Sequence, residues 1–229
     1  MSDVRRLFAL LSMLLGLAAC SAGPGYVLRG PNVIALDPAV GTVRVDGVDI
    51  NIVAPPGFCI DPRGIRATDA GAVAVIGDCV AAGVDTIADE PAPRSPIDAV
   101  MTVSAAAEPV LGGVGDLGER LALLEAVVQS PNGRALLART PVPAGETPAR
   151  VIQTRRADDT LYALMQDPAG RSPAGAAPRY WRAFTEVRGR MVILTITAFG
   201  ADYPGDPVAL RYLTALRAAL RDGNPPGSA

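Results

Sequence analysis

Three cysteines are the residues best suited to covalent chemistry in this chain of 229 residues. Cys20 belongs to an N-terminal motif that is discussed below. The other two, Cys59 and Cys79, are an even number of cysteines, which in an oxidising compartment is typical of a disulfide. Closing the loop between them would contribute about 3 kcal/mol in the chain-entropy model. Free thiols, or a redox or metal role, are the alternatives, although the Cys-x-x-Cys spacing common in redox pairs is absent.

Cys20 ends a segment typical of export signals. Arg5 and Arg6 supply positive charge, and residues 7–19 form an apolar run that is too short for a bilayer-spanning helix, which needs about 20 residues. The run closes on the letters LAAC (residues 17–20), which resemble the bacterial lipobox. The resemblance implies cleavage before Cys20 and attachment of palmitate-like acyl chains to its sulfur and new amino group. An ordinary secretory signal, or a buried start of the domain, is the alternative.

An acylated Cys20 predicts where the protein is located. Several acyl chains hold a protein firmly at a bilayer, because each buried methylene contributes about 0.8 kcal/mol. Ser21 follows the cysteine, and by resemblance to sorting in well-studied Gram-negative bacteria a residue other than Asp favours the outer membrane over the inner. We therefore expect a cell-envelope protein that faces the periplasm, with two partners: the membrane, through the anchor, and another envelope protein.

The missing residue types exclude several mechanisms. The chain has no histidine, and all 21 of its Lys or Arg residues are arginine. A histidine-based triad, an imidazole metal site, a Walker-type phosphate loop and a lysine Schiff base are thereby excluded. A net charge of −2 with only 4% aromatic residues argues against nucleic acid as a partner. We expect no cofactor, no metal and no catalytic residue, and a GC-rich genome accounts for the missing lysines.

Carboxylates could still perform acid–base chemistry, because one protonated and one ionised acid suffice for glycoside hydrolysis. Turn chemistry accounts for the position of each candidate pair equally well. An exported hydrolase that uses such a pair remains the alternative to a non-enzymatic binding module. The candidate pairs are Asp46 with Asp49, Asp89 with Glu90, and Asp158 with Asp159.

The letters GVGDLG place Gly113, Gly115 and Gly118 in a G-x-G-x-x-G pattern before an expected helix. This pattern brings backbone amides to a pyrophosphate in dinucleotide sites. Here Pro109 and further residues separate the pattern from the preceding strand, and no acidic residue follows at the required distance. We interpret the glycines as a flexible helix start and expect no nucleotide.

The letters RYWRAF form the one aromatic and basic cluster. On a strand, Arg179 and Trp181 would lie on one face, and Tyr180 and Arg182 on the other. A surface for recognition by stacking and cation–π contacts is one interpretation. The other is a strand half-covered by helices, with arginines that extend to its edges.

The elements that position these residues follow from hydrophobic periodicity. Asp46-Gly47 supplies a two-residue turn inside an alternating pattern over 43–52, which predicts a hairpin. Residues 57–64 are expected to turn the chain. The apolar run over 191–199 is typical of a central strand covered on both faces. The other expected strands are 72–78, 99–105, 149–154, 161–166 and 179–187.

Helices are expected at three places. Asp116 and Glu119 resemble a capping box before leucines at helical spacing, and Ser130 precedes a shorter helix through Leu137. A final helix begins at residue 206 and stops at Gly223. The order strands, helices, strands, helix predicts an α+β fold with a mainly antiparallel sheet and helices packed on its faces.

The expected organisation is a signal peptide over 1–19, a lipidated tether over 20–41, one α+β domain over 42–223 and a flexible tail over 224–229. The letters YWRAFTEVRGRMVILTITAF resemble, at the level of the fold, the PsbP-like α/β/α sandwich. The lipobox followed by VAPPGFCIDP and VIGDC resembles a family of small alphaproteobacterial exported lipoproteins of unknown function, some of which carry a cation-transport ATPase label. The chain lacks the phosphorylation motif and the transmembrane bundle which that label would require.

Overall fold

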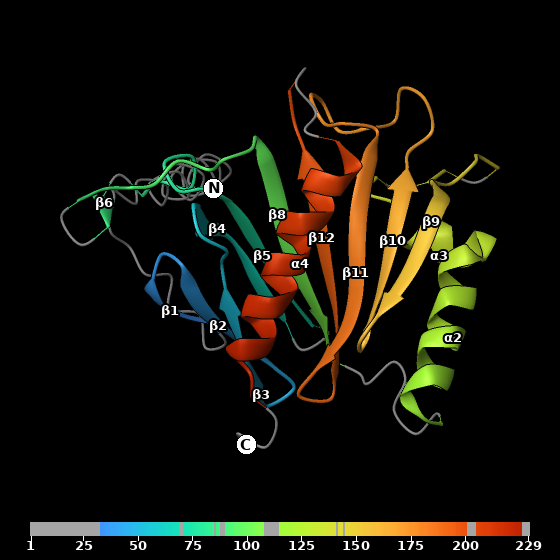
Figure 1. Cartoon of the computed structure of the whole chain (residues 1–229), viewed down its shortest axis with the longest axis horizontal. Helices are drawn as coiled ribbons and strands as arrows, with labels where there is room; N and C mark the ends of the chain where they lie inside the picture. The colour runs from blue at the N-terminus through green and yellow to red at the C-terminus, as the bar shows by residue number, and fades with distance from the viewer. Residues whose placement is uncertain are drawn as a thin grey trace, which may run out of the picture.

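The computed structural model describes residues 33–68, 71–84, 86–87, 90–107, 115–140, 142–143, 145–200 and 205–225. The predicted signal peptide, the lipidation site Cys20 and the first part of the predicted tether lie outside the described residues. The described residues form an α+β fold in which a large antiparallel sheet carries helices on both faces (Figure 1). The predicted fold class is confirmed.

The main sheet has seven strands, and every neighbouring pair in it is antiparallel. The apolar segment expected to be central is indeed the fourth strand in the sheet order, flanked by three strands on either side. In spatial order the strands are β4 (Phe58–Thr68), β5 (Gly71–Asp78), β8 (Ala99–Ala106), β12 (Arg190–Ala198), β11 (Arg179–Val187), β10 (Thr160–Gln166) and β9 (Arg150–Ala157).

A second sheet has three strands: β1 (Val33–Asp37), β2 (Val40–Val45) and β3 (Val48–Val53). Asp46 and Gly47 join β2 to β3 with φ values of 47° and 74°, the left-handed conformations that a tight hairpin turn requires. The predicted hairpin is confirmed. Two very short strands, β6 (Thr86–Ile87) and β7 (Glu90–Pro91), pair with each other.

One face of the main sheet is covered by two elements. Helix α4 (Asp206–Asp222) packs on β11 and β12, and the β1–β3 sheet packs on β4 and β5 (Figure 1). The helix buries Leu213, Leu216 and Leu220 completely, and Trp181 lies in the same core. We call this side of the sheet the closed face.

The opposite face carries α2 (Leu117–Gln129) and α3 (Pro131–Leu136), which stand at the β9 end of the sheet (Figure 1). The capping box is confirmed, because the Asp116 carboxylate accepts from the Glu119 N–H and Glu119 reaches back to the Asp116 N–H. Helix α2 packs on β9 and β10 and does not extend over β4, β5 and β8. We call this side the open face.

Three parts of the sequence interpretation differ from the structure. Residues 58–68 form strand β4 rather than a turn, with an irregular register between Asp61 and Arg66 that accommodates Pro62. Strand β1 lies within the predicted tether and pairs with β2. Asn224, assigned to the tail, is buried and its side chain bonds to the backbone of Asn51.

Candidate functional site

A row of cross-strand partners crosses the open face. Each residue in the row pairs with the next across the sheet, so that all their side chains point to the same side. Helix α2 covers the last two members, and the first four lie beyond it. The row runs Arg66, Val73, Ser104, Ile193, Phe184 and Leu161.

The uncovered end of this row is the floor of an apolar groove of about 520 Å³. The wall beside this floor is made by α2, α3 and the residue after α3, Leu137. A volume of this size lies within the roughly 300–1,000 Å³ range of small-molecule sites. The apolar lining consists mainly of Val73, Ala106, Leu124, Val127, Val128, Leu136, Leu137, Phe184, Met191 and Ile193.

Several large apolar side chains at this groove are exposed to solvent. Leu136 is 85% exposed, Val127 is 46% exposed, and Val73 on the floor is 38% exposed. Single exposed apolar residues need no explanation, whereas a contiguous set that lines a concave surface marks an interaction site. The groove is therefore the candidate functional site.

The polar groups of the groove are Arg66 and Thr68 at its β4 edge and Ser104 on β8, in the middle of the floor. The Arg66 Nη1 donates hydrogen bonds to the carbonyl oxygens of Arg63 and Ile65 at 2.5 and 2.8 Å. Among the described residues that line the groove, none is an Asp or a Glu, so Arg66 gives this end a positive charge.

A glycine allows α3 to form the wall of the groove. Gly133 packs against the last turn of α2, where an added Cβ would collide with the carbonyl oxygen of Val127. The Ser130 side chain begins α3 by accepting from the Gly133 N–H at 3.0 Å. The sharp turn from α2 into α3 places Leu136 and Leu137 beside the floor.

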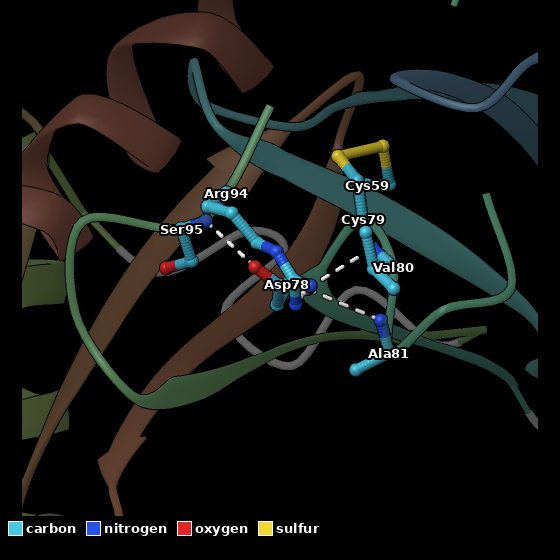
Figure 2. The surroundings of a disulfide bond; sticks show 7 residues. All are labelled: Cys59, Asp78, Cys79, Val80, Ala81, Arg94 and Ser95. Carbon is cyan, nitrogen blue, oxygen red and sulfur yellow. Dashed lines mark hydrogen bonds and ion pairs between the residues drawn. A yellow bond between two sulfur atoms is a disulfide. The ribbon is translucent and has the colours of Figure 1, made fainter. Parts of the chain in front are cut away.

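The disulfide between Cys59 and Cys79 is present, as predicted (Figure 2). Cys59 pairs with Gly77 across the strands, so its side chain points to the open face, beyond the groove. Both cysteines are fully buried, and they pack with Ala82 and Ala92. The bond holds the segment after β5 against the β4 edge.

Asp78 precedes this disulfide and organises the loop around it. Its carboxylate accepts hydrogen bonds from the backbone N–H groups of Ser95, Val80 and Ala81 at 2.7, 3.0 and 3.1 Å, and Arg94 lies 3.6 Å away (Figure 2). The bond from Ser95 is the main cause that lowers the pKa of Asp78. The ionised carboxylate joins the two ends of the loop that follows β5.

The aromatic residues of β11 occupy the two cores. Trp181 is 3% exposed, lies on the closed face and donates from its Nε1 to the Asp206 carbonyl at 3.0 Å. Tyr180 is 1% exposed and lies on the open-face side under the α3 region. The predicted separation of the two rings to opposite faces is confirmed. Stacking on a surface ligand needs an accessible ring, and neither of these rings is accessible in this structure.

The arginines of β11 are held differently. Arg179 forms an ion pair with Asp206 at 2.7 Å near the start of α4. The Arg182 guanidinium lies 5.7 Å from the centre of the Tyr180 ring, and the Arg139 guanidinium lies 4.1 Å from the same ring. Burial lowers the pKa of Arg182 and raises that of Tyr180. Arg182, Arg139 and Tyr180 belong to the packed part of the open face, Arg179 lies on the closed face, and none of the four lines the groove.

Four of the six carboxylates considered for catalysis are engaged by arginines. Asp46 pairs with Arg190 at 2.7 Å and Asp49 with Arg44 at 2.6 Å. Asp158 and Asp159 both pair with Arg217 of α4. Glu90 lies exposed in β7, and its predicted companion Asp89 lies outside the described residues. These acids lie at the ends of strands and not in the groove.

The glycine-rich pattern is only partly described, because Gly113 lies outside the described residues. Gly115 precedes the capping box and Gly118 lies between its two members, and the carboxylates of Asp116 and Glu119 occupy the α2 N-terminus. In the described part of the chain, no group of three or more Asp, Glu, Cys or His side chains gathers as a metal site would require. None of the described helices combines the length and apolar character needed to cross a bilayer.

No protein-family model matches this chain, and no curated protein matches it significantly. The candidate site therefore rests on the structure alone. Sequence reasoning did not find the groove, because its lining comes from five strands and two helices far apart in the chain. The local signal was the presence of exposed apolar residues on α2 and α3 that line the groove, Val127 and Leu136.

Proposed function

We propose that this chain is a membrane-anchored lipoprotein of the cell envelope that acts as a non-enzymatic binding or accessory module. Cys20 carries the acyl chains, the folded domain faces the periplasm, and the outer membrane is favoured over the inner. The groove on the open face is the binding site. The observation that carries the proposal is the apolar lining left uncovered beside α2, with Leu136 85% exposed at its edge.

Two further features support this proposal. The disulfide between Cys59 and Cys79 fits an oxidising compartment such as the periplasm. The apolar run before Cys20 has the length and flanking charge of an export signal. The motifs around the two disulfide cysteines are the basis for our proposal that the chain is one of the small exported lipoproteins that it resembles.

Acylation is tested by expressing the whole chain in a Gram-negative host supplied with a clickable palmitate analogue. We expect label on the native chain, and its recovery with the membranes. The Cys20→Ala variant should lose the label, while the matched Ser21→Ala variant should keep it. A native chain that stays unlabelled, or keeps its leader, contradicts the anchor.

Binding in the groove is tested with Nile red, an uncharged apolar dye whose fluorescence rises on leaving water. Val127 lines the groove, whereas Leu123, one turn earlier on α2, does not, and the two are about equally exposed at 46% and 44%. Val127→Asp should reduce dye binding at least tenfold, and Leu123→Asp should leave it nearly unchanged. Equal effects of the two substitutions would contradict the groove as the binding site.

A further inference from the structure

We propose that the groove binds a single-chain anionic amphiphile, with its apolar tail along the floor and its negative head at Arg66. This inference rests on the proposed function, because it takes the groove as the binding site. It names the chemical class of the ligand and the residue that selects it.

The floor of the groove fits an apolar tail. Val73, Ala106 and Ile193 form a surface of small and medium side chains on neighbouring strands, and Val127 and Leu136 face them from the helices. A tail in this position would remove exposed apolar atoms of the floor and of the helix wall from water. The groove volume of about 520 Å³ matches the size of one small ligand. A stable protein interface is a much broader surface, which buries about 800 Å² on each partner.

The charge at the edge of the groove selects the head group. Arg66 pairs across the strands with Val73, so its side chain stands at the β4 end of the floor. Two backbone carbonyls accept hydrogen bonds from its Nη1, and among the described residues no hydrogen bond engages Nε or Nη2, the two nitrogens that form the side-on fork of a guanidinium. Among the described residues, no carboxylate lies within 4.0 Å of this guanidinium.

The opposite end of the row does not offer such a site. The last member, Leu161, pairs across the strands with Arg156 of β9. Arg156 forms an ion pair with Glu125 of α2 at 2.5 Å, so its charge is already balanced. An arginine fork matches the two oxygens of a carboxylate or a phosphate. The combination of an apolar floor with an arginine that pairs with no carboxylate of the described residues favours a ligand that is apolar along most of its length and negative at one end.

Two sources supply this chemistry: a free fatty acid with a carboxylate head, or a lysophospholipid with a phosphate head. The test uses myristate, 1-myristoyl-lysophosphatidylglycerol and uncharged tetradecanol, which share one tail length. Each is kept below its critical micelle concentration. The protein is the Cys20→Ser chain, exported and purified without detergent, because it carries no acyl chain of its own that could enter the groove.

Binding is measured by displacement of Nile red and checked by calorimetry. We expect at least one of the two anionic probes to bind at least fivefold more tightly than tetradecanol. Arg66→Gln should weaken the anionic probes about fivefold and leave tetradecanol unchanged. Arg63 provides the matched control, because it lies on the same strand, pairs with Asp61 and does not line the groove. Arg63→Gln should change none of the affinities.

The outcomes separate this inference from the proposed function. If tetradecanol binds as tightly as the anions, or Arg66→Gln changes nothing while Val127→Asp abolishes binding, the anionic head is wrong and the groove remains a binding site. If no probe binds, or Val127→Asp is without effect, the amphiphile is wrong and so is the groove as its site. The more tightly bound anion tells a fatty acid from a lysophospholipid.

Discussion

The two faces of the seven-stranded sheet are covered to different extents. On the closed face, α4 and the β1–β3 sheet lie side by side, and Leu213, Leu216 and Leu220 of α4 are fully buried. On the open face, α2 and α3 cover the β9–β10 end and leave Val73 and Leu136 in contact with water. One sheet thus has a well-packed core on one side and a partly exposed apolar groove on the other. If the groove is the binding site that we propose, stability and binding should respond to different substitutions.

The open face is nevertheless firmly built where it is packed. Arg139 and Asp167 form an ion pair at 2.5 Å between almost fully buried side chains, and Arg139 also donates to Thr197 and to the Ala177 carbonyl. Removing one partner of a buried pair leaves the other charge without compensation. The groove is therefore confined to one part of the open face, and the rest of that face is well packed.

The largest expected effect comes from that buried pair. Arg139→Met should lower the free energy of unfolding by about 3–5 kcal/mol, because Asp167 would remain buried without its cation. Urea denaturation measures the loss. Arg150→Met, an exposed change on β9, is the control and should cost less than about 0.5 kcal/mol. A loss below 1 kcal/mol for Arg139→Met would mean that the pair is hydrated.

A matched pair of leucines compares the two faces directly. Leu213→Ala on the closed face should destabilise the protein by about 2–5 kcal/mol, because it leaves a cavity in the core. Leu136→Ala on the open face should change stability by less than about 0.5 kcal/mol and should weaken Nile red binding instead. Thermal and urea unfolding check the first change. Similar losses for the two variants would refute the difference between the faces.

The disulfide at the β4 edge should contribute a smaller but measurable amount. Reduction, or the Cys59→Ala and Cys79→Ala double variant, should lower stability by about 2–4 kcal/mol. Because the bond lies beyond the groove, dye binding under native conditions should persist. Loss of binding without loss of stability would show that the disulfide shapes the groove itself.

The smallest effect is the pH dependence, to which Asp78 beside the disulfide and Asp159 beside α4 each contribute one carboxylate. Hydrogen bonds, chiefly from the Ser95 N–H, lower the pKa of Asp78. At Asp159, burial raises the pKa, but the bonds from Arg217 and Thr160 outweigh it and the net pKa is lowered. A lowered folded pKa gives stability that is present above the unfolded value of about 3.9 and is lost as the pH falls through the folded value.

Unfolding free energies measured between pH 7 and pH 2 test this dependence. Asp78→Asn and Asp159→Asn should each flatten the acid side of the curve and cost about 1 kcal/mol at pH 7. Asp98→Asn, on an exposed residue whose carboxylate lies outside both networks, is the control. An unchanged acid slope in both variants would contradict the assigned hydrogen bonds.

Much of the fold could be predicted because its signals are local. The Asp46-Gly47 turn, the Asp116 capping box and the apolar strand β12 each depend on a few neighbouring residues. Strand β4 was missed because Pro62 interrupts its alternation, and only pairing with β5 absorbs the irregularity. The spacing of Tyr180 and Trp181 predicted their faces correctly. Their burial depends on α3 and α4, which come from distant parts of the chain.

The groove, too, depends on distant parts of the chain and therefore could not be predicted from the sequence. No single stretch specifies that α2 packs at the β9–β10 end of the sheet and leaves Val73 and Ser104 uncovered. The exposed Leu136 looks in the sequence like one more core residue of an apolar helix. Only the packed arrangement of strands and helices separates the leucines that stabilise the domain from those that are available to a ligand.

The most direct test of the account is a methyl NMR titration of the isotope-labelled Cys20→Ser chain with myristate. We predict that chemical-shift changes concentrate on the methyl signals of four open-face residues, Val73, Val127, Leu136 and Ile193. The methyl signals of Leu213 and Leu220 on the closed face should not change. Shifts that are spread evenly over both faces, or confined to the closed face, would contradict the open face as the binding site.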